Sequence, residues 1–159
     1  MNDGAIVTIG EILVEIMATT RGEGFREAQP LTGPYPSGAP AIFIDQVGRL
    51  GHPAAIVSAV GDDDFGFLNL ERLKRDGVDV SAVAIHPGAA TGSAFVRYRP
   101  DGGRDFVFNM RDSAAGRSAA TLEADAVLAA AGHLHVMGSG LPGPAVCCMV
   151  RNALPAIKA

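Results

Sequence analysis

The hydrophobic pattern alternates between mostly apolar runs and stretches with helical spacing. Mostly apolar runs cover residues 5–10, 53–60 and 132–138, and helical patterns cover residues 39–50, 64–75, 122–131 and 142–157. A short apolar run is typical of a strand buried on both faces, and strands separated by helices form parallel sheets. This order predicts an α/β fold in which helices cover both faces of a mainly parallel sheet.

Local signals predict where two of these helices begin and end. Pro40 suits the first turn of the helix over residues 39–50, and Gly51 suits the position just after its end. The acidic run at residues 62–64 supplies a cap for the helix over residues 64–75. Other segments are expected to be extended (residues 11–17 and 78–85) or loop and short strand (residues 19–37).

Residues 94–109 differ from the rest because apolar and polar side chains alternate there. Two alternating runs, 94–99 and 104–109, flank the turn sequence Pro-Asp-Gly-Gly at residues 100–103. This pattern predicts a β-hairpin with one polar face that stands away from the buried main sheet.

Composition narrows the classes of function. The chain has 159 residues, of which 48% are hydrophobic and 19% charged, which suits one globular domain with a sizeable core. A net charge of −4 argues against nucleic acid or an anionic membrane as a partner. It does not exclude a phosphate-bearing ligand, because loop N–H groups and a few arginines suffice locally.

The expected compartment is the cytoplasm. The two cysteines, Cys147 and Cys148, are adjacent, and neighbours in sequence seldom form a disulfide with each other. Residues 1–4 lack the basic segment of a signal peptide, and no apolar run approaches the roughly 18 residues that span a bilayer. We therefore predict a reduced protein with no membrane partner.

The residue order within these elements carries a more specific signal. The informative strings are GEILVE at 10–15, SGAPAIFIDQVGRLG at 37–51, VGDDDFG at 60–66, LKRDGV at 73–78, TGSA at 91–94 and NMRDSAA at 109–115. This ordered set resembles the first half of a PfkB (ribokinase-like) carbohydrate kinase. Within that family it is most similar to the tagatose-kinase-like or 2-keto-3-deoxygluconate-kinase-like branches.

The resemblance implies a fold and its division. It implies a ribokinase-like three-layer α/β/α sandwich with a mainly parallel sheet and a small β-strand lid over a sugar site. Residues 1–159 would be the N-terminal portion of one such domain, with lid segments at about residues 11–37 and 91–112. Because the lid also forms a dimer surface in several relatives, a homodimer is expected.

The resemblance also implies a reaction, in which the γ-phosphoryl group of ATP is transferred, with Mg, to a hydroxyl of a ketose or keto-sugar acid. The family's catalytic base is an Asp in a late Gly-x-Gly-Asp motif, and its nucleotide site lies in the half that would follow residue 159. The nearest string here, residues 137–141, has Leu141 where that Asp is required. We therefore expect no catalytic residue in this chain, and no activity from it alone.

Two alternatives remain open. A non-catalytic sugar-binding module or a truncated remnant would also lack the Gly-x-Gly-Asp motif. A nucleoside kinase of the same family would need an aromatic wall near the lid, which Phe95, Tyr98, Phe106 and Phe108 could supply. Binding of adenosine would distinguish the nucleoside kinase from a sugar kinase.

Four candidate sugar-binding residues follow from positions that match the family. Gly38 matches a glycine that lies against the sugar, and Glu15 stands where many relatives have a sugar-binding Asp. Asn109 and Arg111 match lid positions that contact sugar or acid groups in keto-sugar-acid kinases. Their structural alternatives are a helix-entry glycine, a solvent-facing strand residue and surface hairpin groups.

Two more candidates lie in the first helix and after a core strand. Ile42 stands where the family commonly has an Asn that hydrogen-bonds the sugar, which isoleucine cannot do. Asp45 shares a helix face with Ile42, so Asp45 or Gln46 is a candidate replacement, with a solvated helix flank as the alternative. Ser139 follows a core strand at its carboxyl edge, where ligands bind in open α/β sheets.

No metal site is expected in this chain. The three aspartates at 62–64 are better explained as caps of the following helix, because carboxylates favour a helix N-terminus. His133 and His135 share one face of a strand, but no further ligands with clear spacing accompany them.

Overall fold

The main sheet of the protein is parallel throughout. A computed structural model describes residues 4–117 and 121–157, so the expectations for the two chain ends at residues 1–3 and 158–159 lie outside the described residues. The strands of this sheet are β1 (Ala5–Ile9), β4 (Ala54–Gly61), β5 (Val78–Asp79), β6 (Val83–His86) and β9 (Ala131–Val136). They lie in the order β5-β4-β1-β9, with β6 also paired to β4.

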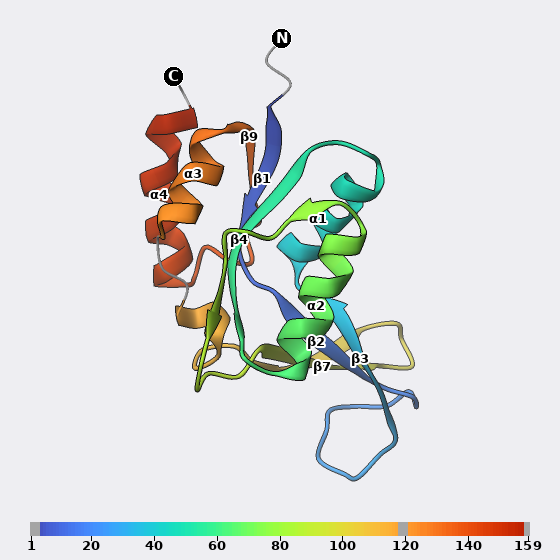
Figure 1. Ribbon diagram of the computed structural model, residues 1–159. Helices are drawn as coiled ribbons and strands as arrows, with labels where there is room; N and C mark the ends of the chain where they lie inside the picture. The colour runs from blue at the N-terminus through green and yellow to red at the C-terminus, as the bar shows by residue number, and fades with distance from the viewer. Residues whose placement is uncertain (1–3, 118–120, 158–159) are drawn as a thin grey trace.

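Helices cover both faces of this sheet, as the hydrophobic pattern predicts (Figure 1). One face carries α1 (Ala39–Arg49) and α2 (Asp64–Arg75), and the other carries α3 (Leu122–Ala129) and α4 (Pro144–Ile157). Alternate residues of β4 serve the two cores: Ile56 packs with α1 and α2, whereas Val57 packs with α3 and α4. All eight residues of β4 are buried, which explains why this strand carries an unbroken apolar run.

The elements follow the predicted boundaries closely, with two differences. The predicted strand over residues 78–85 is split into β5 and β6, because the Asp79 carboxylate accepts a hydrogen bond from the Ser81 N–H at 2.8 Å and turns the chain. The last helix begins at Pro144 rather than Pro142, because residues 137–143 form successive turns. No helix in the described ranges has both the length and the apolar character needed to cross a bilayer.

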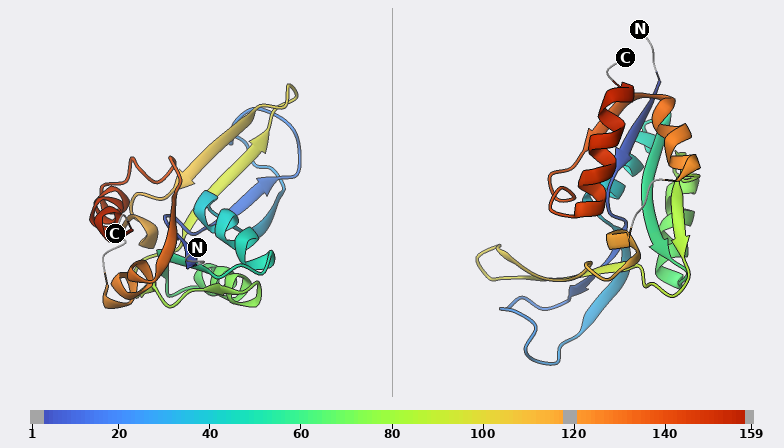
Figure 2. Two further views of the ribbon diagram at one scale, coloured as in Figure 1. Left: turned by 90° about the horizontal axis from the view of Figure 1, so that it is seen from above. Right: turned by 90° about the vertical axis from the view of Figure 1, so that its left-hand side faces the viewer.

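A second, small sheet stands away from the main one, as predicted for the hairpin (Figure 2). It consists of β2 (Leu13–Ala18), β3 (Leu31–Ser37), β7 (Gly92–Tyr98) and β8 (Arg104–Asn109), in the order β3-β2-β7-β8. The β2–β7 pairing is parallel and the other two are antiparallel. The segment predicted as loop or short strand thus supplies the seven residues of β3.

The register of the small sheet assigns its side chains to two faces. Paired residues point to the same side of a sheet, and successive residues alternate. Glu15 pairs with Ala94, which pairs with Phe108, so these three define what we call the Glu15 face. Ser93 pairs with Asn109, one residue away on each strand, and these two define the opposite Asn109 face.

Asp63 joins α2 to the strand that enters the small sheet. Its Oδ1 accepts hydrogen bonds from the Gly66 N–H at 2.8 Å and from the Thr91 hydroxyl at 2.7 Å, and its Oδ2 accepts from the Thr91 N–H at 2.7 Å. The Thr91 hydroxyl accepts in turn from the Gly61 N–H at 2.9 Å. Burial tends to raise the pKa of Asp63, but the hydrogen bonds from Thr91 and Gly66 outweigh it and hold this pKa below its ordinary value.

We predict that Asp63→Ala lowers the free energy of unfolding by about 2 kcal/mol at neutral pH, because it removes both the helix cap and the bonds to Thr91. The folded pKa lies below the unfolded one, so this stabilisation is complete above about pH 4 and is lost as the pH falls through the folded value. Urea denaturation across this pH range measures the effect.

The exposed neighbour Asp62 supplies the matched control. Asp62→Ala should change the free energy of unfolding by less than about 0.5 kcal/mol at every pH. Equal losses for the two variants would contradict a specific role for Asp63.

Candidate functional site

Glu11 lies where the chain passes from β1 of the main sheet to β2 of the small sheet, and we call this point the root of the small sheet. It adjoins the turn that follows β9. The Ser139 hydroxyl, in the turn after β9, donates a hydrogen bond to Oε1 of Glu11 at 3.0 Å. Gly38, at the start of α1, has a φ of 107°, and a Cβ added there would lie 2.5 Å from the Glu11 carbonyl oxygen. A glycine is therefore required at this position by both its conformation and its close backbone contact.

Glu15 extends this cluster onto the small sheet. Its Oε2 accepts a hydrogen bond from the Ser37 hydroxyl at 3.3 Å, and Ser37 directly precedes Gly38. We call Glu11, Glu15, Ser37, Gly38 and Ser139 the carboxylate edge. Glu11 and Ser139 follow the carboxyl ends of the parallel strands β1 and β9, where open α/β sheets bind ligands, whereas Glu15 lies within β2 of the small sheet. Both carboxylates can accept hydrogen bonds from hydroxyl groups.

Asn109 and Arg111 lie around a different space. With Asp63, Asp64 and Ser93, and also with Phe108 and Met110, they line a cavity of about 650 Å³ between the start of α2, residues 90–93 and the end of β8. The Asn109 amide donates to the Ser93 hydroxyl at 3.4 Å, on the face of the small sheet opposite Glu15. The structure therefore links Glu15 to Gly38 through Ser37, and links both Gly38 and Ser139 to Glu11, whereas Asn109 and Arg111 line the separate cavity.

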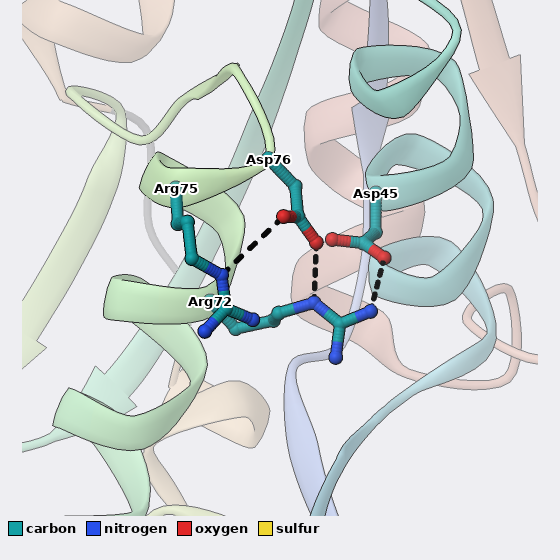
Figure 3. Close-up of polar contacts among 4 residues, drawn as sticks. All are labelled: Asp45, Arg72, Arg75 and Asp76. Atoms are coloured by element: carbon teal, nitrogen blue, oxygen red, sulfur yellow. Dashed lines mark hydrogen bonds and ion pairs between the residues drawn. The ribbon is translucent and has the colours of Figure 1, made fainter.

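Asp45 is engaged between the two helices of its layer (Figure 3). Its Oδ2 lies 3.1 Å from a terminal guanidinium nitrogen of Arg72 on α2. The Nε of Arg72 binds Asp76, whose other carboxylate oxygen lies 3.5 Å from Nε of Arg75. Burial raises the pKa of Asp45 above its ordinary value despite the opposing effect of Arg72. The carboxylate predicted to replace an Asn at Ile42 thus faces α2, and a sugar-binding role for it stays a prediction.

Asp63 and His135 have structural roles, and the aromatic residues considered for a nucleoside site lie on opposite faces of the small sheet. Asp63 caps α2 as predicted, and the His135 ring stacks on Phe43 with 3.7 Å between centroids. Phe106 and Phe108 stack at 5.2 Å on the Glu15 face, whereas Phe95 contacts Phe25 on the Asn109 face. Among residues 4–117 and 121–157, no three His, Cys, Asp or Glu side chains are grouped to hold a metal ion.

Glu11 was not among the residues that sequence reasoning selected. It follows Gly10 at the end of the first buried strand, and a polar residue there faces the ligand-binding edge of a parallel sheet. This position directly after a buried strand was the sequence signal that could have identified Glu11. Its contact with Ser139 joins residues 128 positions apart and is visible only in the folded chain.

Comparison with known proteins now decides the family. Residues 4–155 match the model of the pfkB family carbohydrate kinases. The chain belongs to this family. The fold is accordingly the ribokinase-like α/β fold with a mainly parallel sheet, and the small sheet supplies its additional strands.

Individual relatives agree with this family but are longer than the chain. A fructokinase from Solanum tuberosum is 40% identical over 114 residues, which cover 72% of this chain and 35% of that protein. An Escherichia coli protein provisionally named ribokinase II is 48% identical, with a TM-score of 0.92 over 98% of this chain and 50% of that one. The same E. coli protein in complex with ATP and Mg²⁺ gives a TM-score of 0.90 over 98% of this chain and 49% of that one. The chain thus spans about a third to a half of the length of these relatives.

We predict that Arg72→Met costs about 1–3 kcal/mol of unfolding free energy, because it leaves Asp45 and Asp76 together without their shared cation. Adding Asp45→Asn to Arg72→Met should recover part of this loss, since it removes one of two neighbouring negative charges. Urea denaturation of the wild type, both single variants and the double variant measures this coupling. Strictly additive effects would contradict the arrangement in Figure 3.

Proposed function

We propose that this chain is the sugar-binding portion of a kinase that transfers the γ-phosphoryl group of ATP to a hydroxyl of a ketose or keto-sugar acid. Membership of the pfkB family supports the reaction class. The observation that carries the proposal is the carboxylate edge, where Glu11 contacts Ser139, and Glu15 contacts the Ser37 that precedes Gly38. A sugar offers several hydroxyl donors, and two carboxylates with free lone pairs suit them.

In this proposal the residues bind and orient the sugar, and they do not activate it. Glu15 and Glu11 accept hydrogen bonds from sugar hydroxyls, and Ser37 and Ser139 hold the two carboxylates in place. Gly38 keeps the helix entry free of a side chain, so that the sugar can approach the backbone. Holding a hydroxyl in one orientation is the part of phosphoryl transfer that such a site can supply.

ATP and Mg²⁺ are the proposed cosubstrate and cofactor, supported by the E. coli relative that was solved with both. The described residues offer no cluster of three His, Cys, Asp or Glu side chains that could hold a metal ion, and the chain lacks the Gly-x-Gly-Asp motif. We infer that the chain alone is inactive. We also infer a cytoplasmic location, which the free thiols of Cys147 and Cys148 support.

The kinase proposal is tested on the native polypeptide. Its intact mass is measured first, because the mass shows whether the native protein is longer than these 159 residues. With ATP, Mg²⁺ and D-fructose, we expect ADP formation from a form that includes a Gly-x-Gly-Asp motif, and none from the 159 residues alone. Glu15→Gln should raise the KM for the sugar at least about tenfold, because it weakens a charge-assisted hydrogen bond, and leave the KM for ATP unchanged.

Glu71→Gln, which removes an exposed carboxylate from α2, is the matched control and should change neither KM. Turnover of ATP by the 159-residue chain would contradict the inferred inactivity. An unchanged sugar KM in Glu15→Gln would remove Glu15 from the site. If adenosine binds and the sugars do not, the nucleoside kinase alternative replaces the sugar kinase.

We also propose that the protein forms a homodimer through the small sheet. The Glu15 face exposes a group of aromatic side chains, each with at least 40% of its surface accessible: Tyr35, Tyr98, Phe106 and Phe108. Exposed apolar groups gathered on one face are typical of an interaction surface. A second copy of the chain can bury them symmetrically.

The dimer has a matched pair of test variants on one strand. Phe106→Glu places a charge on the Glu15 face and should convert a dimer into a monomer, whereas Val107→Glu changes the neighbouring residue on the other face and should leave the mass unchanged. Light scattering after gel filtration measures the mass. Equal behaviour of the two variants would contradict a dimer through the Glu15 face.

A further inference from the structure

Two aspartate side chains meet where α1 packs against the end of α2. Asp45 lies in the second half of α1, and Asp76 is the residue that ends α2. The two side chains have only 15% and 16% of their surface exposed. Figure 3 shows one carboxyl oxygen of Asp45 turned toward Asp76. Two carboxyl groups that share such a poorly solvated place do not both ionise readily, because like charges repel at close range.

The arginines beside this pair leave one of its four oxygens without a donor. Arg72 takes one oxygen of each group, since its terminal nitrogen lies 3.1 Å from Oδ2 of Asp45 and its Nε binds Oδ2 of Asp76. Arg75 lies 3.5 Å from Oδ1 of Asp76. Oδ1 of Asp45 is buried and receives no hydrogen bond from any group in the described part of the chain. A buried oxygen without a donor destabilises the fold unless something supplies a proton.

A proton between the two carboxyl groups supplies the missing donor. When Asp45 is protonated, its hydroxyl can donate to Asp76, which keeps its charge for the arginines. Burial raises the pKa of Asp45, and the hydrogen bond with Asp76 raises it further. The hydrogen bond from Arg72 lowers the pKa of Asp76, and the bond with Asp45 lowers it further. The two groups thus separate in proton affinity, as two carboxyl groups that hold one proton do.

The other charged groups that act on the pair are three arginines. Arg72 on α2 and Arg49 on α1 favour the ionised form of Asp45, yet its pKa stays above the ordinary value. Arg75 bonds Asp76 from the solvent side and favours the charge on Asp76. The arginines therefore stabilise one negative charge at this contact and leave the second carboxyl group for the proton.

We propose that Asp45 and Asp76 share one proton, and that this proton latches α1 to the end of α2. The latch is formed where Asp45 is protonated and Asp76 is ionised, and it loosens as the pH rises because two negative charges then lie side by side. Since α1 begins directly after Gly38, the latch holds the helix that starts at the carboxylate edge.

The two aspartates contribute to stability in opposite senses. The folded pKa of Asp45 lies above the unfolded one, so its contribution is complete below about pH 4 and is lost as the pH rises through the folded value. The folded pKa of Asp76 lies below the unfolded one, so its contribution is present above about pH 4 and is lost as the pH falls through the folded value.

The test follows the carboxyl carbons of both residues by NMR while the native protein is titrated with acid. We expect the signals of Asp45 and Asp76 to change together in two separate steps, one above and one below the ordinary aspartate range, because the steps belong to the pair. A single step in the ordinary range for both residues overturns the proposal. A step of Asp45 to which the Asp76 signal does not respond also overturns it, since burial of Asp45 alone then explains the shift.

Variants measured by urea denaturation assign the proton to the pair. Asp45→Asn places an amide donor where the protonated carboxyl group is proposed, so its denaturation midpoint should rise relative to that of the wild type between pH 4 and pH 7. Asp76→Asn removes the group that stays charged and should lower the midpoint at pH 7. Glu71→Gln, on the exposed side of α2, is the control and should shift the midpoint equally at both pH values. An Asp45→Asn midpoint that keeps a constant distance from the wild type contradicts the shared proton.

Discussion

Close backbone contact at the root of the small sheet is the constraint on which the rest of the structure depends. A Cβ on Gly10 would lie 2.4 Å from the Pro40 ring, and one on Gly38 would lie 2.5 Å from the Glu11 carbonyl. The end of β1, the start of α1 and the entry to β2 therefore pack closely, with the Pro40 ring against Gly10 and no side chain between Gly38 and the Glu11 carbonyl. This contact directs the small sheet away from the main one and places Glu11 beside Ser139.

A second consequence of this root is that the small sheet has two chemically different faces. Its strands leave the main body in a defined register, so Glu15 and Phe108 fall on one side, and Ser93 and Asn109 on the other. Asp63 keeps this arrangement in place, because it binds both the first turn of α2 and Thr91, next to the first residue of β7. The separation of the Glu15 side chain from the Asn109 side chain follows from that register.

Much of the fold was predictable from periodicity and caps, because those signals are local. The bounds of α2 were predicted to the residue, since Asp63 and the acidic run mark its start. The division of β5 from β6 depends on one Asp79 side chain hydrogen bond, which a hydrophobic pattern does not reveal. The candidate site was less predictable, because a family position says which residue to examine but not which face of a strand carries it. Asp45 illustrates this limit, since its partner Arg72 lies 27 residues away on another helix.

The alternation of β8 has a consequence for how such a site can evolve. At the end of this strand Phe108 lies on the Glu15 face and Asn109 on the opposite face. A slip of one residue in the β7–β8 pairing would move Phe108 to the opposite face and present the Asn109 amide on the Glu15 face. A single insertion or deletion in the turn at residues 100–103 is the smallest sequence change that produces such a slip. The length of the hairpin turn thus decides whether Phe108 or Asn109 shares a face with Glu15.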